Sequence, residues 1–110
     1  MAFAEKNYVR TQLGSTISTL YTVPALTVSI VKSIHLTNTT ATNKRVTIHI
    51  VPNAGSAADG NKLFDEFLVP ANGVVEYNSW RVMDTAGDTF QGFADSATSV
   101  TIHVDGADIT

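Results

Sequence analysis

Turn residues recur along this chain at intervals of roughly 8 to 12 residues, and the segments between them are rich in Val, Ile and Thr. Val, Ile and Thr favour extended backbone, whereas Pro, Gly, Asn and Asp favour turns. The spacing predicts an all-β fold, a single antiparallel β-sandwich of about eight strands that is jelly-roll or immunoglobulin-like, and it argues against an α/β enzyme fold. The turn signals lie at 14–15, Pro24, 38–43, 52–61, 70–73, 84–88 and 95–99.

The chain has 110 residues, which is enough for one domain with its own core and too few for two. We expect residues 20–110 to form the sandwich. Residues 1–19 are mostly polar, with an extended segment at 8–13. Two interpretations stay open for them: an edge strand of the sandwich, or an N-terminal arm that crosses to a neighbouring subunit.

The longest β-branched run, residues 26–37, does not keep one alternation of apolar and polar positions. Its apolar residues of even number share their parity with Lys32, which would place a charge on the buried face. A β-bulge near Val31 and Lys32 would repair the pattern, and so would a face covered by another subunit. The apolar residues of that parity are Val28, Ile30, Ile34 and Leu36.

Alternation is cleaner in residues 45–51 and 100–104, which are predicted to be half-buried strands. In the first of these strands His49 is expected to point outward. The second is expected to break near Gly106. In the turn before residue 74, Gly73 is expected to take a positive φ, because glycine adopts that conformation most readily.

Charge and composition exclude several classes of function. The net charge is −3 and charged residues make up only 15% of the chain, so nothing favours a general attraction to nucleic acid or to anionic membranes. The absence of cysteine excludes disulfides and thiol chemistry. The start of the chain has no apolar run typical of a signal peptide, and no segment is apolar enough for a membrane helix. We expect a soluble protein made in the cytoplasm.

Three histidines lie in similar settings, each between apolar residues of a predicted strand: His35, His49 and His103. If their strands share a sheet, the three imidazoles could approach one another and bind zinc or nickel. The interpretation that we favour is that they are ordinary strand residues and that the protein holds no metal.

Aromatic side chains offer a second candidate site. Trp80, beside Arg81 at a strand end, and Tyr77 could form a platform for a sugar ring. The simpler interpretation is that both rings help to close the sandwich. No nucleophile elbow, phosphate-binding loop or zinc-protease motif occurs, so we expect neither catalysis nor a cofactor.

Several segments together resemble small β-sandwich structural proteins of tailed bacteriophages, and the likeness covers about residues 20–110. In that family's pattern a small residue or Gly follows Val-Pro-Ala, where this chain has Leu26. The segments that carry the resemblance are LYTVPALTVSIVKSIHLTNTT at 20–40, RVTIHIVPNAGSAADGNKL at 45–63, LVPANG at 68–73 and AGDTFQG at 86–92.

The resemblance implies a non-enzymatic component of the virion that is made in the host cytoplasm. The role we expect first is a capsid decoration, or cement, protein that stabilises the head. The alternatives are a tail, neck or fibre accessory protein, or a carbohydrate-binding adhesion module. The expected partners are major capsid or tail proteins and further copies of the chain, in a trimer or higher ring, with no direct contact to nucleic acid or membrane.

Overall fold

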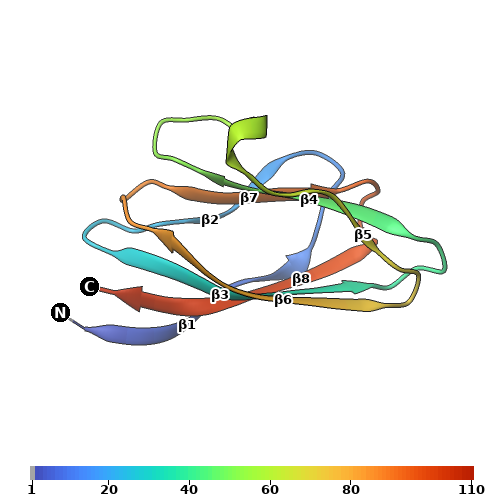
Figure 1. Ribbon diagram of the computed structural model, residues 1–110, viewed down its shortest axis with the longest axis horizontal. Coiled ribbons are helices and arrows are strands. Elements are labelled where there is room, and N and C mark those ends of the chain that lie inside the picture. Colours follow the sequence, from blue (N-terminus) through green and yellow to red (C-terminus); the bar gives the residue numbers. More distant parts are fainter. Residues whose placement is uncertain (1) are drawn as a thin grey trace.

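The computed structural model describes residues 2–110, which form eight strands and one short 3-10 helix. The strands build two four-stranded antiparallel sheets that pack face to face (Figure 1). The predicted all-β sandwich of about eight strands is therefore confirmed. The elements are β1 Phe3–Gln12, β2 Ser18–Thr22, β3 Val28–Asn38, β4 Lys44–Val51, η1 Asp59–Asn61, β5 Lys62–Val69, β6 Val74–Met83, β7 Thr89–Ala94 and β8 Val100–Ile109.

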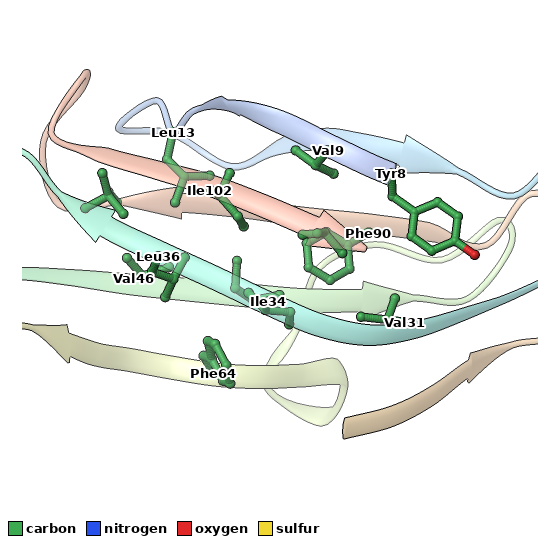
Figure 2. Close-up of a cluster of buried hydrophobic side chains, with 14 of the residues drawn as sticks. Tyr8, Val9, Leu13, Val31, Ile34, Leu36, Val46, Phe64, Phe90 and Ile102 are labelled. Atoms are coloured by element: carbon green, nitrogen blue, oxygen red, sulfur yellow. The ribbon is translucent and has the colours of Figure 1, made fainter. Parts of the chain in front are cut away.

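The first sheet has the strand order β1-β8-β3-β6, and the second has the order β2-β7-β4-β5. The hydrophobic core fills the space between them (Figure 2). Ile34 and Leu36 of β3 face Phe90 of β7 and Val46 of β4 across this space, and all four side chains are buried. Each such side chain contributes about 1.5–3 kcal/mol when it leaves water, so the alternation of the central strands defines which face of each sheet points inward.

On two strands of the first sheet, one residue has no pairing partner on β8. On β1 this residue is Tyr8, between Asn7 and Val9, and on β3 it is Lys32, between Val31 and Ser33. The bulge predicted near Val31 and Lys32 is confirmed. A bulge re-aims the side chains around it.

The bulge divides the apolar residues of β3 between the two faces of the sheet. Ile34 and Leu36 point into the core. Before the bulge, Ser29 points inward, because its hydroxyl contacts Tyr21 of the second sheet. Ile30 therefore points outward, on the opposite side from Ile34 despite their shared parity.

Strand β8 does not break at Gly106, contrary to the sequence-based expectation, and it runs on to Ile109. The backbone of β3 passes very close at this position. A Cβ on Gly106 would overlap the carbonyl oxygen of Ile30 and would lie 2.7 Å from Tyr8 Cε2. The glycine marks a close approach of two strands and not a strand end.

The turn between β5 and β6 also differs from the expectation. The Gly73 N–H donates to Pro70 O at 2.9 Å, so Ala71 and Asn72 are the central residues of the turn. Asn72 takes the positive φ, 52°, and Gly73 does not. Asn tolerates this conformation better than other non-glycine residues because its short amide side chain can bond locally.

The N-terminal residues lie in the first sheet as its edge strand. Strand β1 pairs with β8, and Ala2 and Thr110 exchange two backbone hydrogen bonds of 2.8 Å. Both ends of the chain therefore lie side by side at one end of the molecule (Figure 1). Tyr8, Val9 and Leu13 reach the core from this segment (Figure 2). The division of the chain at residue 19 stays a prediction, as does an arm that crosses to a neighbour.

The only helical element within residues 2–110 is the three-residue η1, and no helix there is long and apolar enough to cross a membrane.

Candidate functional site

The structure brings together two of the three histidines. His35 of β3 and His103 of β8 are directly opposite one another, with ring centroids 6.3 Å apart. His35 Nδ1 lies 3.1 Å from the Glu76 carboxylate on β6. A row of polar side chains therefore crosses this half of the first sheet.

His49 lies in the second sheet, on β4, so the condition for a three-histidine site is not met. It lies outside the core cluster and is nevertheless buried. The loop that contains η1 covers it, and its Nδ1 is 2.7 Å from Asn61 Oδ1. Across residues 2–110, no three His, Asp or Glu side chains converge in a way that could hold a metal ion.

Trp80 and Tyr77, the candidate sugar platform, lie on opposite faces of β6. Tyr77 packs against the core and meets the Phe64 ring edge-on, with centroids 5.0 Å apart. Trp80 is 61% exposed on the outer face. The two rings therefore do not form one platform.

Apolar side chains collect on the outer face of the first sheet, at the end where the termini lie. Phe3 of β1 is 58% exposed, and Trp80 and Val82 of β6 are exposed as well. Lys32 crosses between them, with Nζ 5.3 Å from the Phe3 ring centroid and 5.1 Å from that of Trp80. We call Phe3, Lys32, Trp80 and Val82 the lysine face.

Beneath the lysine face lie two apolar residues that point outward and are nevertheless buried, Ile30 of β3 and Ala107 of β8. A long lysine stem can cover apolar surface while its ammonium stays near water. The bulge at Lys32 and the flanking rings account for this covering. The result is a largely apolar surface with the Lys32 cation at its centre and the exposed Glu5, which pairs with Ala107, on its β1 side.

The lysine face continues into a turn and a shallow pocket. Leu26, in the turn before β3, is 93% exposed and takes a φ of 56°, which is strained for a leucine. A pocket of about 350 Å³ lies beside it, lined by Val28, Asp84 and Ile109 among others. Apolar side chains at the rim of a pocket are typical of surfaces that meet another protein.

A buried polar cluster fixes the strands beneath this end. Asp108 Oδ1 lies 2.7 Å from both Ser29 Oγ and Tyr8 Oη, and Lys6 Nζ lies 3.3 Å from Oδ2. Burial alone raises the pKa of Asp108, but hydrogen bonds from Ser29 and Tyr8 and the Lys6 charge hold this pKa below its ordinary value of 3.8. Burial, and then the hydrogen bond to Asp108, raises the pKa of Tyr8. The cluster ties β1, β3 and β8 together.

A second exposed apolar site lies on β5, an edge strand of the second sheet. Asp65 and Glu66 together face the single residue Thr47 of β4, so β5 bulges there. Glu66 takes a φ of 48°, and Phe67 and Leu68 beside it are each 41% exposed. We call Glu66, Phe67 and Leu68 the acidic edge.

Sequence reasoning singled out Lys32 and Trp80, and it noted Leu26 in place of a small residue or Gly, but it missed Phe3 and the acidic edge. Lys32 gave a signal because it interrupts an apolar pattern. Phe3 joins it only through the strand order β1-β8-β3, which no local pattern encodes.

No model of a known protein family matches the sequence, and no curated protein matches it. Solved structures match the fold. A protein in the structure of infectious bursal disease virus, Gx strain, is 13% identical, with a TM-score of 0.56 over 97% of this chain and 31% of that chain. The VP2 subviral particle of the same virus gives 11% identity and a TM-score of 0.52, over 97% of this chain and 32% of that one.

A pentameric capsid protein from metagenomic phage sequences is 16% identical over 96% of this chain and 59% of that chain, with a TM-score of 0.43. The chain therefore spans about a third of the length of the two virus proteins with which it shares a β-sandwich fold.

Proposed function

We propose that this chain is a non-enzymatic structural protein of a tailed bacteriophage virion, and more specifically a decoration protein that binds the capsid and stabilises the head. The observation that carries the proposal is the uncovered apolar surface formed by the lysine face and Leu26. Exposure of these side chains does not stabilise a free-standing protein, because burial of apolar surface away from water is what lowers the free energy.

Two further features support this role. The fold is shared with the VP2 subviral particle of infectious bursal disease virus, which is itself an assembly. The small sandwich also offers edge strands and flat faces, and symmetric assembly multiplies weak contacts at such surfaces. The partners on this proposal are the major capsid protein and further copies of the chain, in a trimer or higher ring.

Binding to virus heads tests the proposal. Heads from phage grown without this gene should bind the purified protein saturably, and binding should raise the temperature at which they release DNA. The matched pair of variants is Trp80→Ala, on the exposed surface, and Arg10→Ala, on the same sheet outside it. Trp80→Ala should weaken binding and Arg10→Ala should not. Absence of binding to heads would overturn the decoration role, and binding to purified tails would favour the tail, neck or fibre alternative.

The exposed ring of Trp80 keeps one alternative of another class, an adhesion module that binds carbohydrate. An exposed indole can stack on a sugar ring, and the adjacent Lys32 would favour an acidic sugar. A glycan array separates this function from the first. Binding that Trp80→Ala abolishes would support adhesion, whereas an array on which the parent protein binds nothing would exclude it.

A further inference from the structure

We propose that copies of this chain associate head to tail, with the lysine face of one subunit bound to the acidic edge of the next. The contact deepens the proposed function by naming the surfaces that join the copies. The lysine face binds the next subunit, and Leu26 with the pocket beside it is left to meet the head. Trp80→Ala then weakens head binding because it separates the copies and removes the gain from multiple contacts. It would form in the purified protein whether or not the chain binds a capsid.

The first half of the contact is a cation without a partner. Within residues 2–110, three cationic side chains have neither an ion pair nor a hydrogen bond: Arg10, Lys32 and Lys44. Of these, only Lys32 contacts exposed aromatic rings, those of Phe3 and Trp80. Lys32 thus presents a positive charge in the middle of an apolar surface, where a carboxylate on an apolar partner would be most strongly favoured.

The second half of the contact is a carboxylate without a side-chain partner. Ion pairs or hydrogen bonds occupy the other carboxylates of the described chain, which leaves Glu5, Glu66 and Asp95 without a side-chain partner. Glu5 is excluded as the partner because it lies on the same sheet as Lys32, and Asp95 is excluded because it lies in a polar turn. Only Glu66 is followed by two exposed apolar side chains, those of Phe67 and Leu68.

The local backbone presents Glu66 to a partner. Its φ of 48° is unfavourable for a non-glycine residue, and the bulge is held by the Glu66 N–H, which donates to Thr47 Oγ1 at 3.2 Å. Arg45 donates to the carbonyl oxygen of Glu66 at 3.2 Å and not to its carboxylate. The Glu66 carboxylate can therefore bind a cation of another subunit.

The positions of the two surfaces decide the symmetry of the assembly. The lysine face is on the first sheet, at the end where the termini lie. The acidic edge is on the second sheet, on a strand that runs toward the opposite end of the molecule (Figure 1). Two different surfaces on one subunit make a heterologous contact, which repeats from subunit to subunit and closes into a ring if the rotation allows.

Charge reversal tests the contact in purified protein. Lys32→Glu and Glu66→Lys should each place like charges across the interface. Because this costs several kcal/mol, we expect each to weaken self-association by roughly a hundredfold. The variant with both changes restores opposite charges and should recover most of the assembly. Arg10→Glu and Asp95→Lys make the same charge changes elsewhere and should assemble like the parent protein.

Mass by sedimentation velocity over a range of concentrations gives the readout, with circular dichroism and thermal unfolding as the check on folding. Lys32→Ala, which removes the charge without reversing it, should give an intermediate loss. A parent protein that stays monomeric at millimolar concentration would overturn the inference, as would single reversals that assemble normally or a double variant that gains nothing over the singles. A protein that fails on capsids yet passes this test would refute only the proposed function.

Discussion

At Leu26 the strained backbone lowers the stability of the fold, whereas the exposed side chain is expected to strengthen binding to virus heads. Its side chain is 93% exposed, and its φ of 56° costs a non-glycine residue about 1–2 kcal/mol. Leu26→Gly removes this strain, but it adds roughly 0.5–1 kcal/mol of unfolded-chain entropy. We expect the free energy of unfolding to rise by up to about 1 kcal/mol and binding to virus heads to weaken. Urea denaturation and head binding measure the two effects.

The matched control is Leu26→Ala, which keeps a side chain at positive φ and so keeps the strain. This variant should bind heads as weakly as Leu26→Gly without becoming more stable than the parent protein. If Leu26→Gly were less stable than the parent, the strain argument would fail.

At Gly106 of β8, the backbone of β3 and the ring of Tyr8 come too close to leave room for a side chain. Gly106→Ala would place a Cβ on the carbonyl oxygen of Ile30 and 2.7 Å from Tyr8 Cε2, so backbone must move. Overpacking typically costs about 1–3 kcal/mol, and we expect a loss at the upper end of that range or beyond, measured by urea unfolding. Gly60→Ala is the control, because no atom lies within 4 Å of its added Cβ. Equal stabilities for the two variants would contradict a close approach at Gly106.

Asp108 should make stability depend on pH. Its folded-state pKa is held below 3.8, so the carboxylate contributes stability above that value, and the contribution is lost as the pH falls through the folded pKa. Asp108→Asn removes the charge that the hydrogen bonds and Lys6 stabilise. Hydrogen bonds to a charged group are worth about 1.5–3 kcal/mol, and we expect a loss of that order at pH 7.

The pH dependence of the Asp108→Asn effect shows whether the lost stability comes from the carboxylate charge or from side-chain packing. The difference in unfolding free energy between Asp108→Asn and the parent should shrink as the pH is lowered below about 4, because the parent then loses its own charge. Urea unfolding at a series of pH values measures this difference. A constant difference down to about pH 2, well below the ordinary pKa of an aspartate, would assign the effect to packing alone.

Deletion of strand β1 distinguishes the two interpretations of the N-terminal segment, a strand of the sandwich and a detachable arm. An arm could be removed without harm to residues 20–110, but β1 is a strand of the first sheet and it places Tyr8, Val9 and Leu13 in the core. Truncating one large core side chain costs about 2–5 kcal/mol, and a domain has only about 5–15 kcal/mol in total. We expect deletion of residues 1–13 to abolish folding.

Near-ultraviolet circular dichroism and amide dispersion in NMR spectra measure that outcome. Deletion of residues 1–2 alone is the control and should leave both spectra intact. A folded product from the longer deletion would favour a detachable arm.

The elements also explain how much of the structure the sequence could predict. The bulge at Lys32 was predictable because a single strand records it as an interrupted alternation. The path of β8 through Gly106 was not, because the reason for the glycine is the backbone of another strand. The outward direction of His49 was predictable because its strand alternates, but its burial was not, because only the fold of the loop at residues 52–61 covers it. Local periodicity thus predicts strands and their faces, and what covers a face depends on strand order.

The same limit applies to the candidate site. Lys32 and Trp80 drew notice within their own strands, whereas Phe3 reaches Lys32 only because β8 lies between β1 and β3. Glu66 gave no signal, since its exposure depends on the bulge opposite Thr47. The chemistry of these residues is readable from the sequence, but their grouping on two surfaces is a property of the folded chain.

For the whole molecule, a head-to-tail contact predicts a result that neither surface alone would give. Lys32→Glu and Glu66→Lys subunits should each fail to assemble alone, yet an equimolar mixture should assemble. In the mixture, the introduced glutamate of the first variant faces the introduced lysine of the second. The unchanged Lys32 of the second variant likewise faces the unchanged Glu66 of the first, so every contact between unlike subunits joins opposite charges.

Because like subunits repel in such a mixture, the two variants must alternate, and a closed ring must then contain an even number of subunits. If the parent ring has an odd number, the mixed assembly should differ from it in mass, by at least one subunit. Native mass spectrometry with one variant isotopically labelled counts both kinds of subunit. A mixture that stays monomeric, or that yields rings with unequal numbers of the two variants, would rule out the contact between Lys32 and Glu66.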